Sequence, residues 1–207
     1  MEKTALIAQI TGEAYLHMLD WRHDIDLQLI QFQLDHGGEA LVIMFVPEYG
    51  MHRITELPSP GTARPHASSF GGGYEYCFLY SSTGWTLRVT NTTQRSFRFE
   101  HLTPIPPLLI EDTAEVRVGL RPSEGVRWTS ASGLQDDSDS IPIDRTATEA
   151  RFTIDGEMYE RLLAEGWTPE KMTAYEYRFI PLSVGCEIMV EHPASGTKNH
   201  LTKDVGW

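Results

Sequence analysis

An alternating stretch from Tyr74 to Thr90 narrows the choice of fold for this chain. In its first half every second residue is aromatic, and these residues are Tyr74, Tyr76, Phe78 and Tyr80. Because side chains on a β-strand point alternately to its two faces, the four residues form one aromatic ladder. The polar turn at 81–84 and the second alternating half predict a β-hairpin. The ladder is either a core strand of a β-barrel or the wall of a ligand cavity.

Length and charge limit the class of protein and its partners. A chain of 207 residues is long enough to bury a sizeable core and fits a single domain over 1–207, with an extension at 1–56 and a core at 72–192. A net charge of −12 opposes nucleic acid and anionic membranes as partners. Two cysteines, Cys77 and Cys186, indicate reduced thiols, and the sequence contains no secretion signal or membrane-length apolar run. We therefore expect a cytoplasmic protein.

The first 56 residues are expected to form a helix and a hairpin. Apolar residues recur at helical spacing from Thr4 to Leu19, which predicts an N-terminal helix. Residues 25–34 alternate with a slip between Leu29 and Ile30, which predicts a strand with a β-bulge. The run 40–46 is apolar on both faces, so it predicts a strand covered either by the N-terminal helix or by a second subunit. The second alternative predicts a homodimer.

The remaining pattern is dominated by short strands. Residues 57–73 are rich in proline and glycine and predict a long loop, and residues 130–140 predict a solvated loop. Strands are expected at 96–101, 116–118, 126–128, 152–154, 175–179 and 184–190. Asp155 is expected to cap a short helix from Met158 to Glu165. Many short strands without βαβ alternation predict a mainly β fold, an antiparallel barrel or sandwich with these two helices.

Several short motifs resemble those of one enzyme family. They are Phe78 with Tyr80, Thr83-Gly84-Trp85, the strand 94–100, the segment 127–133, Pro169-Glu170-Lys171 and Ile180-Pro181-Leu182. Their order and separation resemble the phenolic acid decarboxylases, which are small lipocalin-like barrels of the calycin type. The related MoaF-like barrels share the pattern equally well. The resemblance covers about Gly72 to Leu182 and implies an antiparallel calycin-like β-barrel with one small ligand inside.

The chain departs from that family at the residues that carry its chemistry. The decarboxylases use two tyrosines that grip a carboxylate, an arginine, and a glutamate that handles protons. Here Tyr80 matches one tyrosine, Phe78 replaces the other, and Ser130 replaces the glutamate. The position of the arginine falls in the Pro106-Pro107 region. Without that acid or base, the same decarboxylation by the same residues is not expected.

The expected barrel interior offers candidate site residues. The candidate acids or hydrogen-bond donors are Tyr76, Tyr80, His101 and Tyr177. The candidate substrate-binding residues are Tyr74, Phe78, Trp85, Phe97, Phe99, Trp128, Ser130 and Tyr175. Such a lining suits a flat aromatic or hydrophobic ligand, acted on by a lyase, cyclase or isomerase without metal or cofactor. The alternative from another class is a noncatalytic small-molecule-binding or interaction protein.

A degenerate cupin is the competing barrel. His66 and Glu75 loosely resemble part of the first cupin metal motif, but Ser68 stands where a second histidine is needed. Because a hydroxyl is a poor substitute for an imidazole ligand, no metal site is expected.

Overall fold

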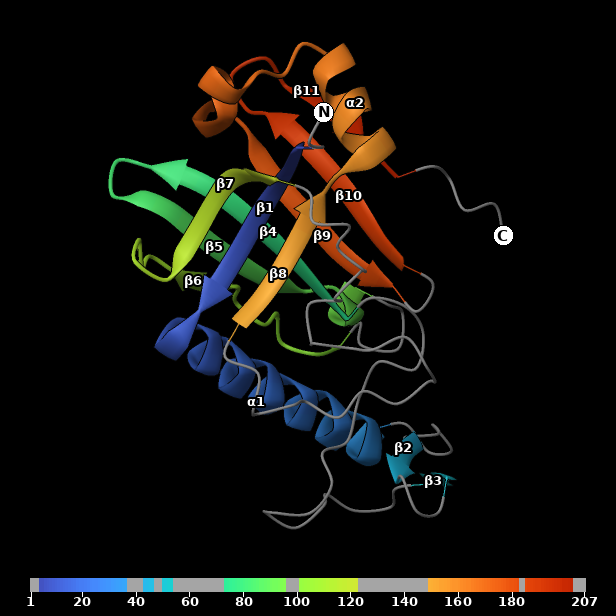
Figure 1. Ribbon diagram of the computed structural model, residues 1–207. Coiled ribbons are helices and arrows are strands. Elements are labelled where there is room, and N and C mark those ends of the chain that lie inside the picture. The colour runs from blue at the N-terminus through green and yellow to red at the C-terminus, as the bar shows by residue number, and fades with distance from the viewer. Residues whose placement is uncertain are drawn as a thin grey trace.

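The computed structural model describes residues 4–36, 43–46, 50–53, 73–95, 101–122, 149–182 and 185–202. Its described part is mainly β, and its strands pair antiparallel (Figure 1). The larger sheet has the order β11-β10-β9-β4-β5-β6. Its strands are β4 Tyr74–Ser81, β5 Gly84–Asn91, β6 Leu108–Ile110, β9 Glu176–Leu182, β10 Gly185–His192 and β11 Thr197–His200.

The second sheet has three strands in the order β7-β1-β8. They are β1 Thr4–Thr11, β7 Val116–Pro122 and β8 Glu149–Ile154. The short strands β2 Ile43–Val46 and β3 Gly50–Arg53 form a separate pair. The helices are α1 Gly12–His36 and α2 Gly156–Ala164, with short 3-10 helices η1 Thr93–Arg95 and η3 Pro169–Ala174.

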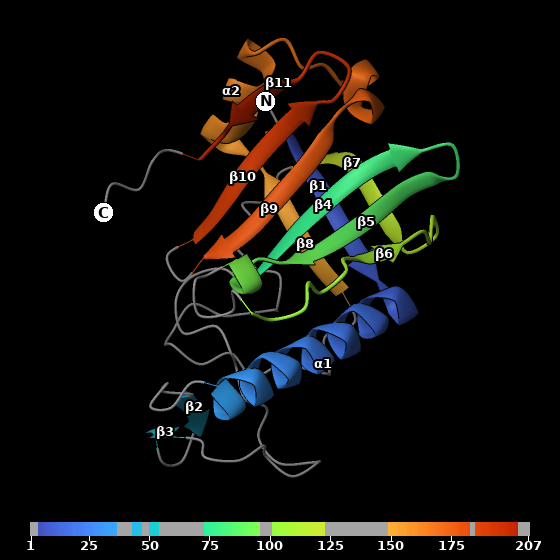
Figure 2. The ribbon, with the colours of Figure 1, turned by 180° about the vertical axis from the view of Figure 1, so that it is seen from behind.

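The three-stranded sheet packs face to face on the six-stranded sheet, as the two opposite views show (Figure 1 and Figure 2). Phe152 of β8 lies at the centre of this contact. Its ring centroid is 5.0 Å from that of Tyr76, 5.6 Å from that of Phe78 and 4.8 Å from that of Phe179. Among the described strands neither sheet closes on itself, so the expected antiparallel β architecture is confirmed at the level of two open, packed layers.

The predicted hairpin is confirmed. Strands β4 and β5 pair along their whole length, from Tyr74 opposite Asn91 to Ser81 opposite Gly84. Gly84 has φ +114°, a conformation that residues with a side chain rarely adopt. The turn therefore lies where the sequence places it.

The N-terminal helix prediction is confirmed only for residues 12–19, and the predicted bulged strand is wrong. Residues 4–11 form strand β1, and the helix α1 begins at Gly12 and continues through the expected bulged strand to His36. Strand β1 is buried on both faces, so its near-continuous apolar run carries no clear period. In α1 the buried residues follow helical spacing, and they include Ala14, Tyr15, Met18, Leu19, Ile25, Leu29 and Ile30. The period-two pattern in 25–34 was incidental.

A distant carboxylate caps the start of α1. The backbone N–H of Ala14 donates to Glu115 Oε2 at 2.6 Å, and the N–H of Glu13 donates to Glu115 Oε1 at 3.2 Å. The first N–H groups of a helix have no partner within it, and a negative charge there also complements the helix dipole. A side chain at Gly12 would collide with this carboxylate.

The positions of the later strands agree with those predicted from the sequence. β7, β8, β9 and β10 are found where they were predicted, and Asp155 is the N-cap residue of α2, although its side chain makes no capping hydrogen bond. Of the apolar stripe expected in α2, Leu162 is fully buried but Leu163 is 37% exposed. Strand β11 was not predicted.

Several other predictions concern residues outside the described part. These are 40–42 of the apolar run, the loop at 57–72, the strands at 96–100 and 126–128, and the loop at 130–140. In the part of the chain that the structure covers, no helix is long and apolar enough to cross a membrane.

Candidate functional site

The aromatic ladder is mostly core. Tyr74, Tyr76 and Phe78 are buried and pack in one apolar cluster with Trp85, Tyr175 and Tyr177. Tyr80 differs, because 49% of it is exposed and its ring lies against Trp85 with the centroids 5.2 Å apart. The expectation that Tyr80 points inward is therefore wrong, since the hairpin extends past the edge of the facing sheet there (Figure 2).

Tyr177 is hydrogen-bonded within the protein. Trp167 Nε1 donates to the Tyr177 hydroxyl at 2.8 Å, and that hydroxyl donates to the Met172 carbonyl at 2.9 Å. Burial raises the pKa of Tyr177 above its usual range, and burial likewise raises the pKa of Tyr76. These phenols are weaker acids than a free tyrosine, which does not favour proton transfer near neutral pH.

Tyr74 joins the sheet to α1. Its hydroxyl lies 2.6 Å from Asp26 Oδ1 and 3.0 Å from the carbonyl of Arg22, and the Arg22 guanidinium lies 4.7 Å from the centroid of the Tyr74 ring. Burial, and next the negative charge of Asp26, raise the pKa of Tyr74. We interpret this cluster as the polar part of the helix–sheet contact.

The other predicted site residues are not gathered at one place. His101 lies in an exposed turn, so the expectation that it faces inward is wrong. Tyr175 is buried beside His192, with ring centroids 4.9 Å apart. Phe97, Phe99, Trp128 and Ser130, and the cupin-like His66 and Ser68, lie outside the described residues.

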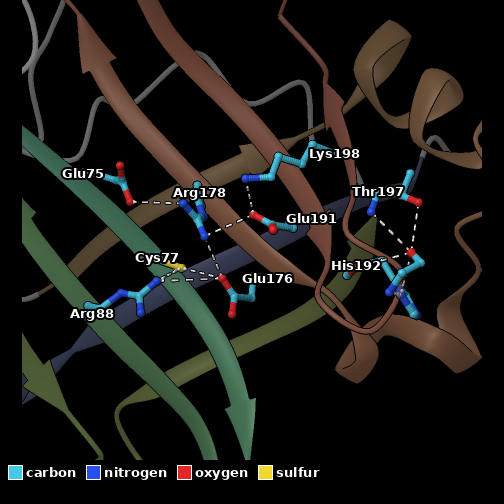
Figure 3. Close-up of polar contacts among 10 residues, drawn as sticks. Glu75, Cys77, Arg88, Glu176, Arg178, Glu191, His192, Thr197 and Lys198 are labelled. Carbon is cyan, nitrogen blue, oxygen red and sulfur yellow. Dashed lines mark hydrogen bonds and ion pairs between the residues drawn. The ribbon is translucent and has the colours of Figure 1, made fainter.

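A charged network covers the outer face of the larger sheet (Figure 3). Arg178 Nη2 lies 3.1 Å from carboxylate oxygens of both Glu176 and Glu191. The Cys77 Sγ lies 3.6 Å from Glu176 Oε2 and 3.5 Å from Arg88 Nη2. Burial, and next the charge of Glu176, raise the pKa of Cys77 to about 12, so this thiol stays protonated and unreactive at neutral pH.

A small pocket lies on the outer face of the three-stranded sheet. It has a volume of about 130 Å³ and is lined by Ile7, Gln9, Arg117, Val118, Gly119 and Arg121. This volume is below the roughly 300–1,000 Å³ of pockets for drug-sized ligands, so it fits a small molecule. Sequence reasoning missed this site completely.

The strand register explains the chemistry of the pocket. Gln9 lies opposite Arg117 on one side and opposite Arg151 on the other, so an amide stands between two guanidinium-bearing residues. Gln9 is only 8% exposed, and its buried Oε1 accepts no hydrogen bond from any residue that the structure describes. Gly119 forms part of the wall, and a Cβ atom added there would have nothing within 4 Å. The space beside β7 is therefore open at the position where this strand lacks a side chain.

The sequence held one signal of this pocket. Arg117, Gly119 and Arg121 are spaced by two, so they share one face of a strand whose other face carries the buried Val116 and Val118. Nothing in the sequence links them to Gln9.

The described residues contain no group of three or more His, Cys, Asp or Glu side chains placed to hold a metal ion. Comparison of the chain with protein-family models, curated proteins and solved structures found no match in any of the three. The resemblance to the decarboxylase-like barrels stays a prediction.

Proposed function

We propose that this protein is a noncatalytic small-molecule-binding protein whose ligand occupies the pocket between β1 and β7. The observation that carries the proposal is the lining of the pocket, in which the exposed Arg117 and Arg121 stand beside the amide-bearing Gln9 and the apolar Ile7. A small ligand that accepts hydrogen bonds from an arginine and covers the apolar side chain would fit such a lining.

The chemistry of the lining favours binding over catalysis. No histidine, carboxylate, thiol or hydroxyl is among the six described residues that line the pocket. General acid–base catalysis and nucleophilic catalysis both need such a group within reach of the substrate. Arginine and amide side chains instead orient a ligand through hydrogen bonds.

A reaction inside a closed, calycin-like barrel is a less favoured proposal. A lyase, cyclase or isomerase of that kind needs an interior cavity beside the aromatic ladder. In the described core, Tyr76 and Phe78 instead pack directly on Phe152. The homodimer likewise stays a prediction.

Filling the pocket tests the proposal. Gly119→Trp places a large side chain where the wall is open, and Gly119→Ala adds a single methyl group and serves as the matched control. A small-molecule panel is screened by thermal shift against the parent protein and both variants, with circular dichroism to confirm the fold. We expect compounds that stabilise the parent protein and Gly119→Ala but not Gly119→Trp. Binding that is equal in all three proteins, or no binding at all, would overturn the proposal.

A further inference from the structure

Strand β7 is an edge of the three-stranded sheet. Among the described strands it pairs only with β1, from Val116 opposite Ile10 to Pro122 opposite Thr4. In an antiparallel pair, every second residue directs its backbone N–H and C=O groups away from the partner strand. Such a row of groups on an edge strand can pair with a further strand.

The outer face of this sheet is basic, although the whole chain has a net charge of −12. It carries Arg117 and Arg121 of β7 and Arg151 of β8, all exposed. Arg151 pairs with Glu149 at 2.8 Å. By contrast, neither arginine of β7 forms an ion pair with any residue that the structure describes. Two guanidinium groups along the edge are therefore left for the carboxylates of a partner.

The spacing of these two arginines matches an extended peptide. Arg117 and Arg121 are four residues apart on β7, which corresponds to about 13 Å between Cα atoms at about 3.3 Å per residue. Two acidic residues that are four positions apart on a neighbouring strand have the same separation. Each of them would lie opposite one arginine, so each carboxylate needs to reach only one guanidinium.

Gly119 lies midway between the arginines on the same face. It is opposite Ile7 of β1 and lines the small pocket with it. A Cβ atom added at Gly119 would have nothing within 4 Å. An apolar side chain of a neighbouring strand can therefore lean across this glycine toward Ile7.

A second copy of the same edge does not fit. If two β7 strands paired about a two-fold axis at Gly119, Arg117 of each copy would lie opposite Arg121 of the other. Like charges directly opposite each other destabilise a strand pair, and charged side chains are one means by which edge strands avoid self-association. The charges on β7 therefore favour a partner of opposite charge.

We propose that β7 binds an extended acidic segment of another protein, which adds a strand to the three-stranded sheet. The segment has the pattern acidic-x-apolar-x-acidic. Main-chain hydrogen bonds along the edge supply affinity, and the arginines and the space at Gly119 supply specificity. This inference goes beyond the small-molecule function, because it assigns the backbone of β7 a macromolecular partner.

Fluorescence anisotropy with dye-labelled peptides tests the pattern. The probe is Ser-Glu-Thr-Leu-Thr-Glu-Ser. One control has lysine in place of both glutamates, and the other, Ser-Thr-Glu-Leu-Glu-Thr-Ser, has the same composition with the acids two positions apart. We expect the probe to bind several-fold more tightly than either control. Equal binding of all three peptides, or no binding of the probe at millimolar concentration, would overturn the proposal.

Backbone methylation tests the strand pairing. In an added strand, only alternate N–H groups point toward β7. One probe is N-methylated at both threonines, and another at the leucine and the second glutamate. We expect one of them to lose affinity about tenfold or more and the other to lose much less. Equal affinities of the two methylated probes would show that the peptide does not pair with the edge.

Arginine variants test the position. Arg121→Gln should weaken binding of the probe about twofold to fivefold, because it removes one exposed ion pair. Arg151→Gln is the matched control, since it removes the same charge from the same face at the opposite edge. It should leave the affinity unchanged, with circular dichroism to confirm the fold of both variants. Equal weakening by the two changes would overturn the placement on β7.

The outcomes are independent of the small-molecule screen. If compounds bind in a manner that Gly119→Trp abolishes and the probe does not bind, this inference is wrong and the proposed function stands. If the probe binds as expected and no compound does, the proposed function is wrong and this inference stands.

Discussion

Trp167 and Tyr177 are joined by a hydrogen bond of 2.8 Å between the indole Nε1 and the phenol oxygen, and both side chains are fully buried. Trp167 follows α2, and Tyr177 lies on β9. The hydroxyl that was expected to act on a substrate instead completes a contact between a connecting segment and the sheet. Its role in the described structure is to satisfy buried donors and acceptors.

Tyr177→Phe should therefore destabilise the protein. The change leaves the Trp167 N–H buried without an acceptor, which costs about 1–3 kcal/mol in the free energy of unfolding. Urea denaturation followed by fluorescence measures the loss. Tyr175→Phe is the matched control, because the Tyr175 hydroxyl has no hydrogen bond to any described residue. Equal losses in the two variants would contradict this account.

Tyr80→Phe should have almost no effect. The residue is half exposed, and the change keeps the ring that contacts Trp85. We expect the free energy of unfolding to stay within about 0.5 kcal/mol of the parent value. Ligand titrations should be unchanged as well. If this variant lost binding without losing stability, the ligand site would lie at the hairpin tip and not beside β7.

Glu115→Ala should weaken the start of α1. Two backbone N–H groups lose their acceptor, and the helix dipole loses a nearby negative charge, so we expect a cost of about 0.5–2 kcal/mol. Thermal melts monitored by circular dichroism provide the measurement. Glu111→Ala removes the same charge from a nearby exposed residue and should cost much less. A larger loss in the control would show that overall charge, and not the cap, sets the effect.

The thiol of Cys77 should make stability depend on alkaline pH. Its pKa is raised from 9.0 to about 12 in the folded protein, so the folded state holds this proton more tightly than the unfolded state does. The resulting stabilisation is complete below pH 9 and is lost as the pH rises through 12, at a slope of at most about 1.4 kcal/mol per pH unit. The stability of the parent relative to Cys77→Ser should therefore decrease between pH 8 and pH 11. Urea denaturation at each pH tests this, and a constant difference would refute it.

Local patterns in the sequence were sufficient to predict the β4–β5 hairpin and the strands β7 to β10. Alternation in Tyr74–Tyr80 and in Tyr175–Phe179 identified strands that are covered on one face by the core and on the other by charged side chains. Strand β1 carried no such signal. Its residues are buried on both faces, so a helix and a strand fit its apolar run equally well.

The pocket was beyond sequence reasoning for a different reason. It depends on Arg117 lying opposite Gln9, a pairing of residues more than 100 positions apart that only the strand register establishes. The aromatic ladder, by contrast, led to site residues that the structure places in the core. Tyrosine hydroxyls in a pattern of alternating aromatics look available for chemistry, but whether each has an internal partner depends on residues such as Trp167 and Asp26 from other elements.

The position of β1 between β7 and β8 also sets an order of folding. Leu6 pairs with both Leu120 and Ile154, so its sheet has a very high contact order and is complete only after residue 154 has left the ribosome. At about 5–20 residues per second, synthesis of that intervening chain takes on the order of ten seconds. Throughout that time α1 can form locally, while the apolar strand before it has no partner. The nascent chain therefore exposes a segment of the kind that molecular chaperones bind.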